Sequence, residues 1–182
     1  MTEGKHFTDL AKVGNESVSA SKQLALVSTD IKNQALQKIA AFLEHDYASV
    51  VEANNRDIDE GERQGLSPAM LDRLLLNPER LADIATDLRT VINLPDPIGE
   101  QLDNRILSNG LKVERRRVPI GVIGIIYESR PNVTIDLAAL CLKSGNACIL
   151  RGGREAIYTN TALVSLIRKA IFQTGLPQNS VQ

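Results

Sequence analysis

The chain has 182 residues, with 21 Lys and Arg side chains against 22 Asp and Glu, and therefore a formal net charge of -1. Its 43% hydrophobic and 24% charged residues are ordinary for a globular protein of one domain, or of one domain plus an appendage. This balance excludes a general attraction to nucleic acid or acidic membranes, and two cysteines are too few for a disulfide scaffold.

The sequence shows neither a targeting segment nor a metal-ligand pattern. Its longest nearly apolar run, Val118 to Tyr127, is far shorter than the roughly 18 residues of a membrane helix. The first ten residues lack the apolar core of a signal peptide. The potential soft-metal ligands are scattered along the chain: His6, His45, Cys141 and Cys148. We therefore expect a cytoplasmic protein without a metal site.

Residues 1–94 are predicted to form a helical arm. Two stripes have helical spacing: Ile31, Ala35, Leu36, Ile39, Ala40 and Leu43, and then Leu81, Ile84, Ala85, Leu88, Val91 and Ile92. A weaker stripe runs toward Gly61: Tyr47, Val50, Val51 and Ile58. Ser28 or Thr29 is the expected N-cap of the first helix. Ser67-Pro68 and Asn77-Pro78 each combine a capping residue with proline at the first helical position.

Residues 101–119 are predicted to form a β-hairpin. Two strand-like segments flank Ser108-Asn109-Gly110, and Asn-Gly accepts the positive φ angles of a tight turn. The run Arg115 to Arg117 in the second strand is interpreted first as a solvated or ion-paired face. The alternative is a contact with another subunit or with nucleic acid.

Residues 120–182 are predicted to begin a Rossmann-like parallel sheet, which makes the fold class α/β. The run Val122 to Tyr127 is continuous and β-branched, which is typical of a strand covered on both faces. The elements that follow alternate: a helix over 134–144 ending at Gly145, a strand over 147–150, a helix over 159–174 and a third strand opening at 180–182. Because such a sheet would be incomplete, we expect the chain to be the front part of a longer protein.

Two strand ends are candidate binding segments, because ligands of parallel sheets gather at the carboxyl ends of the strands. In the first, residues 128–132, Arg130 offers donors for a phosphate or carboxylate, and Asn132 either binds a ligand or caps the next helix. In the second, residues 151–155, Arg151 supplies charge for a nucleotide ribose or 2′-phosphate. There Gly152-Gly153 permits close backbone approach or is an ordinary turn.

The cysteines are interpreted as core residues rather than nucleophiles. Cys141 falls on the apolar face of a predicted helix, and Cys148 falls inside a predicted buried strand. Burial in apolar surroundings raises the pKa of a thiol and blocks its access.

The segment from Val118 to Thr134, which contains Tyr-Glu-Ser-Arg-Pro-Asn-Val, resembles the gamma-glutamyl phosphate reductase (glutamate-5-semialdehyde dehydrogenase) family of the aldehyde dehydrogenase superfamily. Supporting likeness lies at residues 140–147, 149–153, 65–74 and 114–117. The resemblance implies NADPH-dependent reduction of L-glutamyl 5-phosphate to L-glutamate 5-semialdehyde and phosphate, in proline biosynthesis. It also implies that the nucleophilic cysteine belongs to a catalytic domain absent from these 182 residues, which alone would be inactive.

The resemblance assigns roles to individual positions. Arg151, Gly152 and Gly153 match the place where relatives hold the cofactor's adenosine ribose, and the strand end along the cofactor comprises Ile126, Tyr127, Glu128 and Ser129. Asn132 is a candidate for stabilising the oxyanion, and Arg130 for contacting the acyl phosphate. The hairpin matches the superfamily's oligomerisation ribbon. The alternatives are another aldehyde dehydrogenase, or a non-catalytic module that binds nucleotides or nucleic acid.

Overall fold

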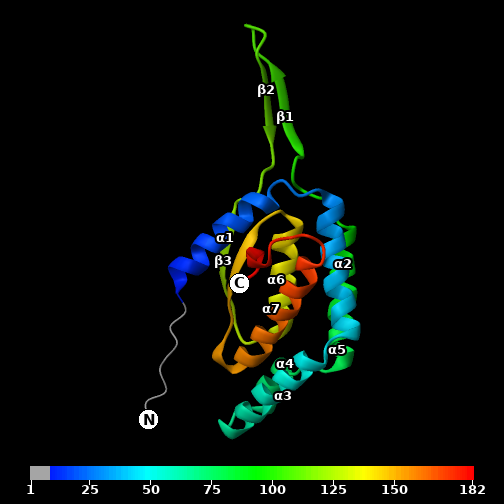
Figure 1. The fold of residues 1–182 in the computed structure, drawn as a ribbon, viewed down its shortest axis with the longest axis vertical. Coiled ribbons are helices and arrows are strands. Elements are labelled where there is room, and N and C mark those ends of the chain that lie inside the picture. Colours follow the sequence, from blue (N-terminus) through cyan, green and yellow to red (C-terminus); the bar gives the residue numbers. More distant parts are fainter. Residues whose placement is uncertain (1–8) are drawn as a thin grey trace.

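The computed structural model describes residues 9–182. His6 and the start of the predicted arm lie outside the described residues. A helical body carries one projecting hairpin (Figure 1). The elements are α1 (Leu10–Leu24), α2 (Thr29–His45), α3 (Ala48–Arg63), α4 (Pro68–Leu74), α5 (Pro78–Asn93), β1 (Gln101–Ile106), β2 (Lys112–Arg116), β3 (Val122–Ile126), α6 (Pro131–Lys143), β4 (Ala147–Arg151) and α7 (Ile157–Phe172), with 3₁₀ turns at Arg154–Ala156 and Gln178–Ser180.

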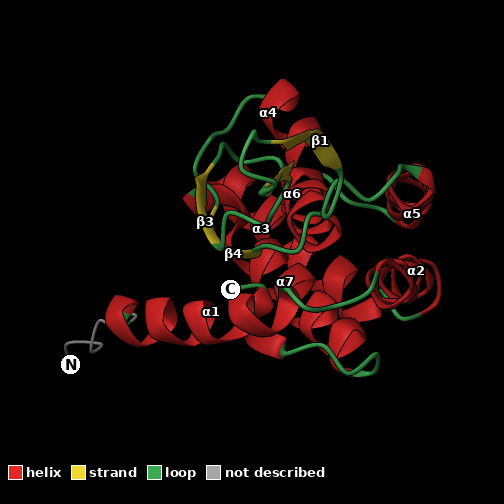
Figure 2. Ribbon diagram, turned by 90° about the horizontal axis from the view of Figure 1, so that it is seen from above, coloured by secondary structure: helices red, strands yellow, loops and turns green. Residues whose placement is uncertain are grey.

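The helical arm begins its helices where the capping residues predict. The side chains of Ser28, Ser67 and Asn77 accept hydrogen bonds from the first turns of α2, α4 and α5. Helices α2 and α5 lie side by side (Figure 2) and bury much of the two predicted stripes. The structure differs at the start of α2, where Ile31 is 37% exposed and Lys32 is buried.

Lys32 is buried because it is paired. Its Nζ lies 2.5 Å from Oδ2 of Asp96, in the segment that leads to the hairpin. Burial opposes ionisation of Asp96, but hydrogen bonds from Lys32, the Ile98 amide and Thr29 keep its pKa below the ordinary value. This buried pair fixes the base of the hairpin to α2.

The hairpin β1–β2 is exposed on both faces and extends away from the body (Figure 1). Only Gly110 of the predicted Asn-Gly turn has a positive φ, of 85°. The Leu107 amide donates to the Leu111 carbonyl and the Gly110 amide to the Leu107 carbonyl, both at 2.9 Å, so the loop consists of the three residues Ser108, Asn109 and Gly110.

The ion-paired interpretation of the arginine run holds for two of its members. Arg116 pairs with Glu114 at 2.8 Å, and Arg117 pairs with Glu100 at 2.7 Å. These pairs neutralise two cations of the ribbon, whereas Arg105, Lys112 and Arg115 have no ion-pair partner among residues 9–182.

The parallel sheet forms as predicted. Strand β3 pairs with β4, and β4 also pairs with the last residues of the chain. There the Gln182 amide donates to the Cys148 carbonyl at 2.9 Å, and the Leu150 amide donates to the Gln182 carbonyl at 2.6 Å. Helix α6 connects the two strands, and α6 and α7 pack against each other and against the arm.

The prediction that the first strand is covered on both faces is wrong. Ile123 and Ile125 pack against the core, whereas Ile126 on the other face is 87% exposed. Within the described residues β3 has a strand partner on one edge only. The central strand β4 is instead the covered one, because its neighbouring residues Ala147 and Cys148, which point to opposite faces, are both fully buried.

Candidate functional site

The two predicted loops emerge side by side from the sheet. Ile126 is the register partner of Arg151, and the Tyr127 amide donates to the Arg151 carbonyl at 3.1 Å. Beyond the strands, the Ser129 hydroxyl donates to the Glu155 carboxylate and joins the loops directly. This bond holds the pKa of Glu155 below its usual value. The adjacency expected from a parallel sheet is therefore confirmed.

The two glycines of the second loop are closely packed by neighbouring side chains. A Cβ on Gly152 would lie 2.2 Å from Nδ2 of Asn160, and one on Gly153 would lie 1.9 Å from Oγ of Ser129. Neither glycine has a positive φ. The close approach that glycine permits is thus already used by neighbouring side chains.

A buried polar network supports that loop from below. The Tyr127 hydroxyl donates to Oγ1 of Thr134 at 2.6 Å, and Thr134 donates to Oδ1 of Asn160 at 2.8 Å. Burial raises the pKa of Tyr127, so its phenol stays protonated at neutral pH. The network ties the end of β3 to the starts of α6 and α7.

Arg151 lies exposed at the carboxyl end of β4. Its Nη1 donates to the carbonyl of Gly152 at 2.6 Å, and the other guanidinium donors have no protein partner among residues 9–182. Together with Tyr127, Asn160 and Arg168 it lines a cavity of about 280 Å³ that runs along the first turns of α7. A cationic group at the mouth of such a cavity can bind a phosphate.

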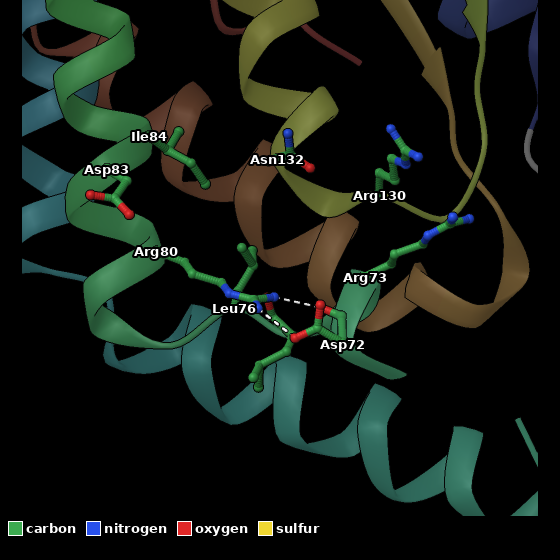
Figure 3. A pocket seen from close by; sticks show the side chains of 9 residues that line it. Asp72, Arg73, Leu76, Arg80, Asp83, Ile84, Arg130 and Asn132 are labelled. Carbon is green, nitrogen blue, oxygen red and sulfur yellow. Dashed lines mark hydrogen bonds and ion pairs between the residues drawn. The ribbon is translucent and has the colours of Figure 1, made fainter. Parts of the chain in front are cut away.

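Arg130 and Asn132 lie at the start of α6. Arg130 is the N-cap residue but makes no side-chain cap, and Asn132 lies inside the first turn. The interpretation of Asn132 as the helix cap is therefore wrong, because the helix begins at Pro131, three residues before the predicted Thr134. Both side chains line a second cavity, of about 380 Å³, between α4, α5 and α6 (Figure 3).

Asn132 and Arg151 thus share one edge of the sheet but face different cavities. The second cavity also contains Arg73 and Arg80, which the sequence analysis did not single out. Arg73 is exposed on the short helix α4 and Arg80 is half-buried near the start of α5, and an arginine at such a helical position looks like ordinary surface in the sequence. Their place beside α6 depends on the packing of the whole arm.

The cysteines are buried, as predicted. Cys141 on α6 is 5% exposed and Cys148 on β4 is fully buried. A hydrogen bond with Cys141, together with burial, raises the pKa of Cys148 far above its usual value. Because these are the chain's two cysteines, the 182 residues present no accessible thiolate.

No cluster of three or more potential His, Cys, Asp or Glu metal ligands comes together within residues 9–182. Nor is any described helix both long enough and apolar enough to cross a bilayer.

Known proteins resemble this chain strongly. No protein-family model matches it. It is 56% identical over 174 residues to gamma-glutamyl phosphate reductase of Vibrio cholerae, a match that covers 96% of this chain and 42% of that protein. The crystal structure of gamma-glutamyl phosphate reductase from Thermotoga maritima superposes with a TM-score of 0.93 at 42% identity, over 96% of this chain and 42% of that one.

A more distant structure shows the same fold. Propionaldehyde dehydrogenase from Rhodopseudomonas palustris matches 99% of this chain and 38% of its own, with a TM-score of 0.61 at 19% identity. The resemblance predicted from the sequence is confirmed. The chain spans about 42% of the length of the curated relatives it matches. In sequence and in fold, the chain corresponds to the amino-terminal part of gamma-glutamyl phosphate reductases, within the aldehyde dehydrogenase-type fold.

Proposed function

We propose that the chain is the cofactor-binding part of an enzyme that reduces L-glutamyl 5-phosphate to L-glutamate 5-semialdehyde and phosphate with NADPH. The observation that carries this proposal is the 56% identity over 174 residues to a named reductase. The activity belongs to the whole protein, since the chain spans only about 42% of such relatives. A biosynthetic reaction of this kind would take place in the cytoplasm.

The cofactor's adenosine end is assigned to the cavity along α7. Aldehyde dehydrogenase-type reductases use nicotinamide cofactors, which supply the hydride. Arg151 suits the 2′-phosphate of NADPH because most of its guanidinium donors have no protein partner in the described structure. The neighbouring backbone of Gly152 and Gly153, with the strand end Ile126–Ser129, would border the rest of the cofactor.

The reacting end of the substrate is assigned to the cavity between α4, α5 and α6. Asn132 would donate its amide hydrogens to the developing oxyanion, and Arg130 would contact the acyl phosphate. Both lie in or next to the first turn of α6, whose positive end also favours an anion. The separation of the two cavities along one sheet edge fits a dinucleotide whose ends bind at different places.

The nucleophile is not assigned to this chain. Cys141 and Cys148 are buried in the core, and displacing phosphate needs an accessible thiolate. We therefore infer that the 182 residues alone have no turnover with L-glutamyl 5-phosphate, or with the semialdehyde in the reverse direction.

The hairpin is assigned to contact with a second copy of the protein. A two-stranded ribbon without packing partners is only marginally stable in water. This one carries exposed apolar side chains, including Ile106 at 66% and Leu111 at 56%. Two of its arginines are ion-paired and the formal net charge of the chain is -1, which disfavours the alternative of a nucleic-acid-binding module.

The cofactor assignment is tested by titrating the 182-residue chain with NADPH and with NADH and following cofactor fluorescence, with the Vibrio cholerae reductase as a positive reference. Arg151→Ala should weaken NADPH binding by about tenfold while changing NADH binding little, because a charge-assisted contact to the 2′-phosphate is lost. Arg105→Ala, an exposed hairpin substitution, is the matched control. An equal loss for both cofactors would remove the 2′-phosphate assignment.

A further inference from the structure

The cavity between α4, α5 and the start of α6 contains three arginines in different states. Arg80 is neutralised, because its Nη2 lies 2.6 Å from Oδ1 of Asp72 and its Nη1 donates to the carbonyls of Asp72 and Leu75. Figure 3 shows this pair beneath the cavity, with Arg73 and Arg130 together on one side of it. The guanidinium groups of Arg73 and Arg130 have no hydrogen-bonding or ion-pair partner among residues 9–182, although the Arg130 backbone amide donates to the Glu128 carbonyl.

Arg73 and Arg130 also stand between two neighbouring cavities. Both line the 380 Å³ cavity and an adjoining one of about 230 Å³, which contains Glu128 and Glu155. Glu155 is already hydrogen-bonded by Ser129. On the side of the larger cavity the Asp72–Arg80 pair cancels, so Arg73 and Arg130 outweigh the remaining carboxylate, Asp83, by one charge. Two neighbouring cations at one cavity favour an anionic occupant.

We propose that Arg73 binds the α-carboxylate of an amino-acid substrate whose other, activated end lies at Arg130 and Asn132. This inference rests on the proposed function and extends it to a residue that determines specificity. Such a substrate carries an acidic group at each end and therefore needs two cations. Arg130 is next to the reacting end, Arg80 is neutralised, and Arg73 on α4 is the cation that remains at this cavity. Its planar guanidinium can bind a carboxylate through two parallel hydrogen bonds.

The experiment compares two ligands on the 182-residue chain by NMR titration. L-glutamate carries the α-carboxylate, and 4-aminobutyrate lacks it. Arg73→Ala should weaken L-glutamate binding about tenfold and leave 4-aminobutyrate binding unchanged, because one charge-assisted contact is lost for the first ligand only. Arg73→Lys should restore part of the loss, since it keeps the charge but not the two-pronged geometry. Arg105→Ala should change neither ligand. Arg73 is exposed and makes no protein hydrogen bond, so its removal leaves the fold intact.

Either of two results would overturn the inference: an equal effect of Arg73→Ala on both ligands, or no effect on L-glutamate. The NADPH titrations of the parent chain and of Arg151→Ala distinguish a failure of the carboxylate assignment from a failure of the proposed function. If NADPH binding still depends on Arg151 while L-glutamate ignores Arg73, the carboxylate assignment is wrong and the cofactor assignment stands. If L-glutamate depends on Arg73 while NADPH does not bind, the carboxylate site stands and the reductase proposal fails.

Discussion

Replacing Asp57 gives the sharpest test of which contacts fix the loop between β4 and α7. Asp57 lies on α3, 3% exposed, and its carboxylate accepts hydrogen bonds from the amides of Tyr158 and Thr159 at 3.2 and 2.7 Å and from the Thr159 hydroxyl. These amides belong to the first turn of α7, whose own N-cap residue, Ala156, has no capping side chain. Asp57 therefore caps α7 from another helix.

The expected cost follows from the groups left without partners. Asp57→Ala removes the acceptor of two amides and a hydroxyl, and Thr159 is fully buried. A buried donor without a partner costs about 1–3 kcal/mol, and losing a helix cap costs about 0.5–2 kcal/mol. Because these terms overlap, we expect a decrease of about 2–4 kcal/mol in the free energy of unfolding. For a chain of this size that corresponds to a Tm lower by about 5–15 °C.

The assay is urea unfolding followed by far-ultraviolet circular dichroism, since the chain contains no tryptophan. The control is Asp59→Ala, two residues away on the exposed side of α3, which should change stability by no more than about 0.5 kcal/mol. Asp57→Asn should be intermediate, because its amide oxygen still accepts a bond while its NH₂ group faces other donors. If Asp57→Ala costs no more than Asp59→Ala, the reasoning that α7 is capped from α3 is refuted.

Three further outcomes are expected. Gly152→Ala should lower the free energy of unfolding by about 1–3 kcal/mol, because the new Cβ would overlap the side-chain amide of Asn160. Gly14→Ala, where nothing lies within 4 Å of the new Cβ, should instead raise the free energy of unfolding by at most about 1 kcal/mol. Equal effects of the two substitutions in denaturant titrations would contradict the packing role of Gly152. Because folding lowers the pKa of Asp96, this carboxylate contributes to stability above its usual pKa of 3.8, and the contribution is lost as the pH falls below that value. The free energy of unfolding of Asp96→Asn should therefore depend less steeply on pH in acid than that of the parent protein. An unchanged slope of the free energy of unfolding against pH would contradict this prediction. Ile106→Asp should reduce the oligomer size measured by light scattering and leave the circular dichroism unchanged, while a monomeric parent protein would rule out the hairpin contact.

Local signals predicted the frame of the fold, because the physics that sets them is local. A serine or asparagine followed by proline satisfies the amides of a helix's first turn whatever lies around it, so Ser67 and Asn77 could be placed from sequence. The parallel order of the strands likewise followed from their alternation with helices. It brought the ends of β3 and β4 to one edge, and with them both candidate loops.

Burial was harder to predict where polar residues are inside. The buried face of α3 comprises Val50, Asn54, Asp57 and Gly61, at helical spacing, but two of these are polar and the apolar stripe therefore looked weak. Asn54 is buried because it donates to the Leu74 carbonyl and accepts from the Leu76 amide, which are 20 and 22 residues away. The hydrophobic pattern of one helix carries no information about such hydrogen-bond partners, because the partners belong to other segments of the chain.

The second loop shows why the same residues can serve two demands. The sequence suggests that Gly152 and Gly153 let the backbone approach a ligand. In the structure, the side chains of Asn160 and Ser129 occupy the space that a Cβ at these two positions would need. Those contacts, with the Asp57 cap next to them, hold the backbone after β4 in one conformation. A loop fixed in this way loses little conformational entropy when an anion binds at Arg151. The packing at Gly152 and Gly153 therefore serves ligand binding indirectly, because it pre-organises the edge of the sheet at which the cofactor is proposed to bind.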